Sequence, residues 1–444
     1  MSNSLLIKNG LIITMNSSQE IIKDNVYVEG NRIVEIGSGK QTADKVIDAS
    51  GCLVLPGFIQ NHVHLNQTLF RGLAEDMNVM DWLRLRIWPL EQAHNEKSIY
   101  DSSRLSLAEM IHSGTTCALT NETLHHTNEV FRAATEIGFR LVGGKIMMDR
   151  WEPGTEMVGE TTRKSIKESL SLLKKFNKSS GGKIRYAFCP RGPRNCSRDL
   201  WNEILKLSDE HDVLIHTHAA ENKTQSELLA SKDGMTDVSY LHSIDATNPR
   251  LVLAHCVWVD ESEIEVLSNT GTKVAHCPST NMKLASGIAP IPDLLDRGVT
   301  VGLGSDGAPA NNNLDIFREM RLASFIQKPR KGPLSMPALS ILKMATIGGA
   351  KVLGLEKEIG SIEIGKLADI VLIRRDVLHA QPNTGSDPIS QIVYEHKSSD
   401  VDTVIIDGNV LLQEGELTRL DQAEIMAHAK ESRRGLIDRA GLSF

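Results

Sequence analysis

The chain lacks a long apolar run, and no stretch reaches the roughly 18 consecutive apolar residues that a membrane-spanning helix needs. Its first 15 residues also lack the apolar core and small-residue cleavage site of a secretory signal. The six cysteines form no C-x-x-C pair, and so few scattered cysteines in 444 residues do not make a disulfide framework. We therefore expect a reduced, cytoplasmic protein with no membrane partner.

An excess of basic charge is also absent. Lys and Arg number 49 against 56 Asp and Glu, which gives a formal net charge of −7. This mildly acidic balance argues against nucleic acid as a partner. Hydrophobic residues make up 41% and charged residues 24%, which is ordinary for a globular protein. The length suits a large domain with an accessory one.

Strand-like segments rich in β-branched and aliphatic residues occupy both ends of the chain. They lie at 5–7, 11–14, 26–29 and 32–36, and again at 368–373 and 403–406, with turns such as Asn9-Gly10 between them. Two strand-rich ends around a different middle predict one small β-sandwich built from residues 1–56 and 361–444, followed by a C-terminal helix.

The middle of the chain, residues 57–360, alternates strand-like runs with amphipathic helices. The eight expected strands are 57–60, 115–121, 141–147, 184–190, 213–218, 251–255, 273–277 and 300–306. Helical patterns cover 161–176, 198–211, 261–267 and 335–353. This alternation predicts an α/β fold, a (β/α)8 TIM barrel, whose chemistry lies where the strands end.

Ionisable side chains stand at several of these strand ends. His62 and His64 follow the first strand as H-V-H, and side chains two apart on an extended segment point to the same side. His218 ends the fifth strand and Asp306 the eighth. Either histidine alone could be a hydrogen-bonded core residue, and Asp306 alone could cap a helix. Together, imidazole and carboxylate ligands indicate a zinc or iron(II) site that activates water.

The motifs and their order resemble those of the amidohydrolase superfamily, in the branch of guanine, adenosine-type and S-adenosylhomocysteine deaminases and triazine hydrolases. The similarity covers nearly the whole chain. It rests on P-G-F-I-Q-N-H-V-H at 56–64, H-T-H-A-A-E at 216–221, A-H-C at 254–256, A-H-C-P-S-T-N at 275–281, G-S-D-G-A-P at 304–309 and E-I-G-S-I-E-I-G-K-L-A-D at 358–369.

This resemblance implies one divalent metal, Zn²⁺ first and Fe²⁺ second. The metal ligands it implies are His62, His64, His218 and Asp306. It also implies catalytic roles for Glu221, which moves a proton, for His255, which polarises the substrate or attacking hydroxide, and for Asp306. His216 and His276 match no ligand position, so we interpret them as residues behind the ligands or in the packing.

The number of metals follows from the fourth strand. Binuclear relatives carry a modified lysine at the end of that strand, whereas this chain has Cys189-Pro190-Arg191 there. Lys145 lies inside the third strand, where a salt bridge or a solvent-facing position is expected. We therefore expect a single metal.

Two sets of residues indicate different substrates. Gln67 and Arg191 match residues of guanine deaminases, and an arginine fork suits a ring carbonyl or an anionic oxygen. Trp82 and Glu91 have the spacing that nucleoside-processing relatives use for base and ribose. Those relatives tend to have histidine where this chain has Arg191, and this difference counts against a nucleoside substrate. A loop-core tryptophan, a solvated glutamate and a surface arginine are the alternative interpretations. Asn121, His125 and Arg150 lie on neighbouring loops without an assigned role.

The resemblance implies a metal-dependent aminohydrolase that releases ammonia from an aminated nitrogen heterocycle, most of all a purine base or nucleoside. One alternative is an s-triazine hydrolase that releases alkylamine or chloride, and Glu221 disfavours it. Another is a non-catalytic assembly relative, which the complete ligand set disfavours. We expect a small heterocyclic amine as partner and a homo-oligomer as the assembly.

Overall fold

The structure is a computed structural model that describes residues 4–151 and 160–442. Contacts divide the chain into two compact units. The first unit comprises Met1–Gln60, Ala108–Cys117 and Asp315–Asp421, and the second comprises Asn61–Leu107, Ala118–Leu314 and Gln422–Phe444. The domain boundaries expected at residues 56 and 360 stay a prediction. No helix among the described residues is long and apolar enough to cross a membrane.

The first unit holds a nine-stranded sheet in the order β19-β18-β17-β16-β5-β1-β2-β3, with β4 beside β1. Its strands are β1 Ser4–Ile13, β2 Ile21–Glu29, β3 Arg32–Ile36, β4 Lys45–Asp48, β5 Cys52–Pro56, β16 Ile370–Arg374, β17 Val401–Ile406, β18 Asn409–Gln413 and β19 Glu416–Leu417. β5 pairs antiparallel with β16, from Ile370 opposite Pro56 to Arg374 opposite Cys52. This pair joins the two ends of the chain into one β-structure, as the sequence predicted.

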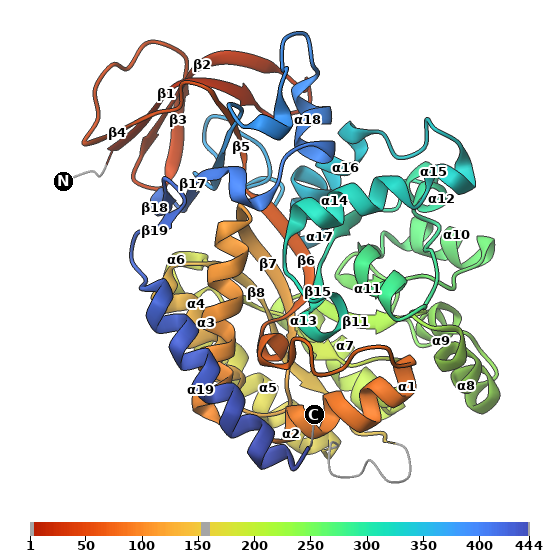
Figure 1. The fold of residues 1–444 in the computed structure, drawn as a ribbon. Coiled ribbons are helices and arrows are strands. Elements are labelled where there is room, and N and C mark those ends of the chain that lie inside the picture. The colour runs from red at the N-terminus through yellow and green to blue at the C-terminus, as the bar shows by residue number, and fades with distance from the viewer. Residues whose placement is uncertain (1–3, 152–159, 443–444) are drawn as a thin grey trace. The chain divides into compact units, whose positions relative to one another are not determined.

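Eight strand positions form the barrel (Figure 1). They are β6 Phe58–His64, β7 Thr115–Glu122, β8 Arg140–Met147, β9 Ile184–Tyr186 with β10 Cys189–Pro190, β11 Ile215–Ala219, β12 Leu251–His255, β13 Lys273–His276, and β14 Val301–Leu303 with β15 Asp306–Gly307. β15 pairs parallel with β6, and the amide of His216 donates to the carbonyl of Phe188 at 2.8 Å, so the fourth and fifth positions also meet. The α/β-barrel fold class is confirmed.

Helices separate the barrel strands. They include α3 Glu96–His112, α4 Thr127–Ile137, α5 Thr162–Phe176, α7 Arg198–His211, α8 Lys223–Asp233, α9 Asp237–Ser243, α10 Glu261–Thr270, α11 Pro278–Lys283, α12 Ile291–Asp296 and α13 Ala308–Asn311. Local sequence sets their ends. In α10, Asp260 and Glu263 form a capping box, and Gly271 takes the left-handed conformation that closes the helix.

The helix expected over 335–353 is two helices, α16 Ala338–Ala345 and α17 Ile347–Leu353. The expectation of one continuous helix is therefore wrong. Thr346 leaves the helical region with φ −131° and ψ −105°, and its hydroxyl donates to the carbonyl of Leu342 at 2.6 Å. A threonine hydroxyl that bonds back to the preceding turn competes with the helical ladder, and two glycines, Gly348 and Gly349, follow one residue later.

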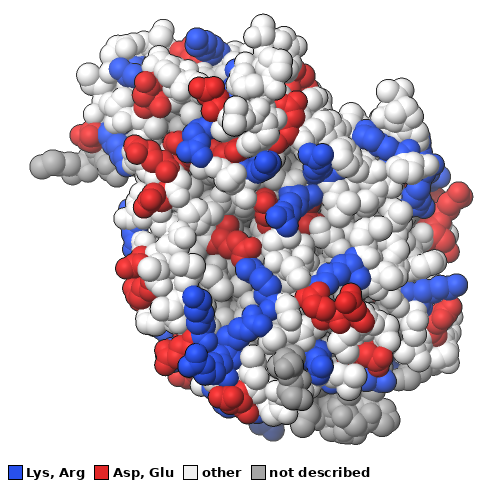
Figure 2. Space-filling model, in the orientation of Figure 1, with Lys and Arg blue, Asp and Glu red and all other residues white. Residues whose placement is uncertain are grey.

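The last helix, α19 Gln422–Ala440, belongs to the second unit and runs alongside α3 (Figure 1). Lys97 on α3 contacts Glu431 at 3.2 Å and Asp101 at 2.9 Å. Ser432 donates to Asp101 at 2.5 Å. On the face that Figure 2 shows, acidic and basic side chains are interspersed, as expected for a chain of small net charge.

Candidate metal and catalytic site

Five ionisable side chains meet at the carboxyl ends of four barrel strands. His62 and His64 lie on β6, His218 on β11, His255 ends β12 and Asp306 begins β15. The pairing of Asp306 with Val63 places the carboxylate between the two histidines of β6. The H-V-H spacing therefore points the His62 and His64 side chains to the same side of β6. The pairing of β15 with β6, which closes the barrel, brings the Asp306 carboxylate to them.

Each of the three expected histidine ligands has its Nδ1 anchored. Nδ1 of His64 donates to the backbone carbonyl of Asn121, and Nδ1 of His218 donates to that of Arg191 at 2.6 Å. Nδ1 of His62 lies 2.7 Å from Nε2 of His216. Anchoring one ring nitrogen fixes the tautomer, so the three Nε2 atoms are left for a ligand.

Distances among these atoms fit a tetrahedral metal. His62 Nε2 and His64 Nε2 each lie 3.3 Å from Asp306 Oδ1, and His218 Nε2 lies 3.3 Å from His64 Nε2. Zinc–ligand bonds of ~2.0–2.1 Å give tetrahedral edges of about 3.3–3.4 Å. Both the donor set and its spacing therefore suit one Zn²⁺ ion.

A second group of two histidines and an aspartate lies in the first unit and differs in its distances. Asp400 Oδ2 lies 2.7 Å from His379 Nε2 and 3.1 Å from His396 Nδ1, and it also accepts the amide of Lys397 at 3.0 Å. These are hydrogen-bond lengths, with three donors on one oxygen. We interpret Asp400 as a hydrogen-bond acceptor.

Burial and the central carboxylate shape the protonation of the site. Burial lowers the pKa of His62 to about 4 and that of His218 well below its usual value. Burial alone would raise the pKa of Asp306, but the charges and hydrogen bonds of His62 and His64 hold it well below its usual value. Burial would lower the pKa of His64, yet the hydrogen bond and charge of Asp306 raise it. The site therefore favours an ionised Asp306 and a protonated His64. A metal ion that binds His64 would displace that proton and find the Asp306 carboxylate already charged.

Glu221 and His255 stand beside the ligands in the same pocket. Burial raises the pKa of Glu221, which favours its protonated form at higher pH than usual. Nδ1 of His255 lies 3.0 Å from Oδ1 of Asn281 on α11, so the ring donates there and keeps its Nε2 lone pair. The sequence motif at 275–281 contained Asn281, but nothing in it assigned this role.

Strained backbone marks three of the strand ends. Ala220, His255 and Asp306 have φ values of 51°, 76° and 61°, in the left-handed region that residues with a Cβ rarely adopt. Such conformations cost of order 1–3 kcal/mol each and persist where the surroundings fix them. Positive φ values also occur elsewhere in the described chain, but these three lie beside the histidine cluster, and strained residues are often found at functional sites.

The pocket at this end of the barrel opens to solvent, and the pocket and its open mouth together span about 700 Å³. Trp82, Gln67 and Arg191 line it together with the metal-site residues. Glu91 accepts from Gln67 Nε2 at 2.9 Å and from Arg191 Nη1 at 3.3 Å. Three of the four expected substrate residues thus line this pocket, and Glu91, which links Gln67 and Arg191, borders the neighbouring pocket.

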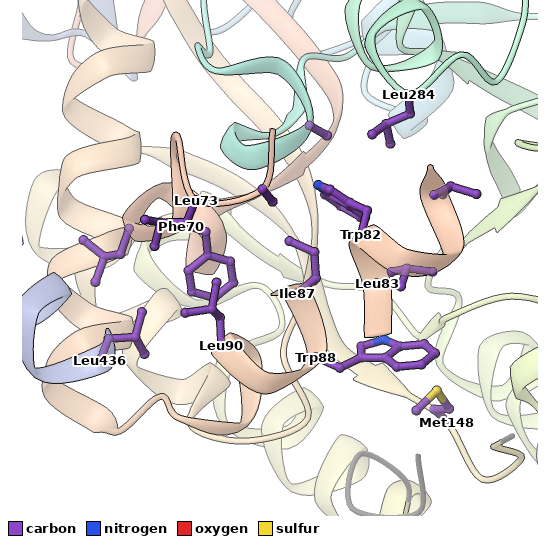
Figure 3. Packing of buried hydrophobic residues seen from close by; sticks show 14 of the residues in the cluster. Phe70, Leu73, Trp82, Leu83, Ile87, Trp88, Leu90, Met148, Leu284 and Leu436 are labelled. Atoms are coloured by element: carbon purple, nitrogen blue, oxygen red, sulfur yellow. The ribbon is translucent and has the colours of Figure 1, made fainter. Parts of the chain in front are cut away.

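An apolar cluster supports the wall that carries Trp82 and Glu91. This wall comprises η1 Leu65–Phe70, α1 Val79–Trp82, η2 Leu83–Ile87 and α2 Trp88–Gln92. Figure 3 shows Trp82 on the side of the cluster toward Leu284, and Phe70 and Leu90 toward Leu436 of α19. Burial of these large side chains fixes the wall from behind.

Other residues that the sequence singled out lie outside this pocket. His125 lines a separate pocket that Glu91 and Arg191 also border. His276 is fully buried, and neither of its ring nitrogens bonds to a described residue. Lys145 forms a buried ion pair with Glu160 at 2.5 Å. The sequence reasoning also missed Glu122, whose carboxylate accepts the amides of Leu65 and Asn66 at 2.9 and 3.1 Å.

Comparisons with known proteins show to which family the chain belongs. The amidohydrolase family matches residues 53–411. The 5'-deoxyadenosine deaminase of Methanothermobacter thermautotrophicus is 40% identical over 415 residues, which cover 92% of this chain and 94% of that protein. The 5-methylthioadenosine/S-adenosylhomocysteine deaminase of Syntrophomonas wolfei is 38% identical over 439 residues, 98% of this chain and 99% of that protein. A crystal structure of an adenosine deaminase from Xanthomonas campestris with bound zinc matches with a TM-score of 0.91 and 29% identity, and covers 98% of each chain.

Proposed function

We propose, from the premise that this chain belongs to the amidohydrolase family, that it deaminates an adenosine nucleoside altered at its 5′ position. The chain is a metal-dependent hydrolase that acts on carbon–nitrogen bonds. The relatives' names specify 5'-deoxyadenosine and 5-methylthioadenosine or S-adenosylhomocysteine, which share an adenine base on ribose. The reaction exchanges the exocyclic amine for oxygen, consumes water and releases ammonia.

One observation carries the proposal. The partly buried acid Glu221 shares a pocket with His64, His218, His255 and Asp306. Hydrolytic deamination of a ring must activate both the attacking water and the leaving amine. A metal-ligand set serves the first need, and a neighbouring proton donor serves the second. Such a donor would have no evident use in a non-catalytic relative.

His62, His64, His218 and Asp306 would hold the metal, and Zn²⁺ fits their donor set and spacing. When bound, the metal would lower the pKa of water toward 7 and so supply the nucleophile. The expected single metal agrees with the fourth strand, where Arg191 offers no ligand to a second ion.

Glu221 would carry the proton. Because burial raises its pKa, it can donate to a ring nitrogen next to the carbon under attack and so make that carbon electrophilic. Left as a carboxylate, Glu221 would then take a proton from the water that adds to the ring carbon and pass it to the departing amine, which leaves as ammonia. His255, fixed by Asn281, would accept a hydrogen bond at Nε2 and orient the attacking water.

The wall residues would recognise the nucleoside. Trp82 offers an aromatic face for the base, and Glu91 offers carboxylate oxygens to ribose hydroxyls. Gln67 and Arg191 hold Glu91 in place, and Arg191 also fixes His218 through its backbone carbonyl. The carboxylate of Glu91 favours a nucleoside over a free base, because ribose would offer it a vicinal pair of hydroxyl donors, whereas Gln67 and Arg191 also match the guanine-deaminase pattern.

A homo-oligomer and a cytoplasmic location stay predictions of the sequence.

An ammonia-release panel tests the proposal. The zinc-loaded protein should release ammonia from 5'-deoxyadenosine, 5'-methylthioadenosine or S-adenosylhomocysteine with a higher kcat/KM than from guanine. Glu221→Gln should lower kcat by about 10²–10⁴-fold, because it removes the proton donor. Glu227→Gln, on the exposed face of α8, serves as the matched control and should retain activity. Chloride or alkylamine release from s-triazines without ammonia release from nucleosides would contradict the proposal.

A further inference from the structure

We propose that His216 is a positioning residue that sets the tautomer and orientation of His62 for metal binding. The inference rests on the proposed function only in taking His62 as a metal ligand. His216 lies on β11, two residues before His218, and both His216 and His62 are fully buried.

The hydrogen-bond chain has one consistent direction. Nδ1 of His216 lies 3.2 Å from the backbone carbonyl of Val252, which can only accept, so this nitrogen carries the proton. Nε2 of His216 is then a lone-pair acceptor, and it lies 2.7 Å from Nδ1 of His62. His62 must therefore donate from Nδ1 and present a bare Nε2 toward Asp306, 3.3 Å away.

His62 differs in this respect from the other two ligands. His64 and His218 are anchored by backbone carbonyls, which no substitution of the anchoring residue removes. The anchor of His62 is a side chain, and its ring meets that of His62 at an interplanar angle of 69° with centroids 4.9 Å apart. One ligand of the site thus depends on a second imidazole, which a single substitution can delete.

A packing role for His216 predicts something else. If the imidazole only filled space, an apolar side chain of similar size would serve as well. If it acts as an acceptor, glutamine should substitute for it, because its side-chain oxygen can take the place of Nε2 and receive the His62 proton. The pair of variants therefore separates the two roles.

The test measures zinc affinity by competition with a chromophoric chelator, which needs no substrate. His216→Leu should weaken zinc binding by about 10–100-fold, the usual cost of losing a partner behind a metal ligand. His216→Gln should restore most of the affinity. His276→Leu is the matched control, since it removes an equally buried strand-end imidazole that bonds to no described residue, and it should leave the affinity close to that of the parent.

A second readout reports the ligand geometry. The visible absorption of the Co²⁺-substituted protein should change in the leucine variant and return in the glutamine variant. If the leucine variant does not fold, His216→Asn takes its place, because its shorter side chain cannot reach His62. Equal losses in the His216→Leu and His276→Leu variants, or no loss in either, would overturn the proposal. Absence of ammonia release would refute the proposed function and leave these affinities unchanged.

Discussion

Single hydrogen bonds decide what each imidazole of this protein can do. The three histidines expected to bind the metal, His62, His64 and His218, donate from Nδ1, so their Nε2 atoms are left for the ion. His94 uses both nitrogens instead, with Ser98 at 2.9 Å on Nδ1 and the carbonyl of Asn66 at 3.0 Å on Nε2. It is therefore a structural histidine, although it is buried to the same degree as His64.

His94 makes stability depend on pH. Burial lowers its pKa to about 3, below the unfolded value of about 6.5. The unfolded chain therefore binds a proton that the folded chain refuses, and the stability present above pH 6.5 is lost as the pH falls toward 3. Between pH 6.5 and 4.5 this group should account for about 2 kcal/mol of the loss. His94→Asn should remove about this much of the loss in the free energy of unfolding between pH 6.5 and 4.5, measured by guanidinium denaturation at each pH. An unchanged pH dependence would contradict the assignment.

At the scale of elements, β7 holds the end of β6 in place. The carbonyl of Asn121 fixes His64, and the next residue, Glu122, accepts the two amides that follow His64 along the chain. The hydroxyl of Thr120 also donates to Glu122. Burial raises the pKa of Glu122, and the hydrogen bonds from Thr120, Leu65 and Asn66 oppose this rise because they stabilise the ionised form.

Glu122→Gln should lower the free energy of unfolding by about 1–3 kcal/mol, because the amide has one acceptor oxygen for the two backbone amides of Leu65 and Asn66. Chemical denaturation of the metal-free protein measures this change. Glu129→Gln on α4 is the matched control, since Glu129 pairs with the half-exposed Arg132 and should cost less than 1 kcal/mol. Equal losses of unfolding free energy in the two variants would contradict the role of Glu122 in holding the end of β6.

The sequence predicted much at the element scale and less at the residue scale. The eight strands were readable because barrel strands are apolar runs between helical patterns, and H-V-H was readable because extended residues two apart share a side. The breaks within the fourth and eighth strands were not readable. The break in the eighth strand lies beside the positive φ of Asp306, and a single aspartate in the sequence does not show that its backbone bends there.

The partners behind the ligands were also beyond the sequence. The contacts of His216 with His62 and of Asn281 with His255 join residues distant in the chain, and they depend on which ring atom faces which neighbour. The sequence motifs contain His216 and Asn281 but do not show which residue each one contacts. The ion pair of Lys145 was one of two alternatives, and its strand position alone did not choose between them.

For the whole molecule, the metal should act as a stabilising ligand. Its four expected ligands come from β6, β11 and β15, so only the folded second unit presents them together. Zinc at 100 times its dissociation constant should add about 2.7 kcal/mol to the free energy of unfolding. Chelation should therefore lower the thermal midpoint, and zinc should restore it in a concentration-dependent way. His62→Ala should lose this response, whereas His428→Ala on the exposed face of α19 should keep it. A midpoint that does not respond to zinc would contradict the site.

The pairing of β15 with β6 has a consequence for the timing of folding. These strands lie far apart in the chain, and closing so long a loop is entropically costly, so their pairing belongs among the slow steps. Asp306 reaches His62 and His64 only through that pairing. High-affinity metal uptake therefore cannot precede barrel closure, and the ion would report the moment at which the ring of strands becomes complete.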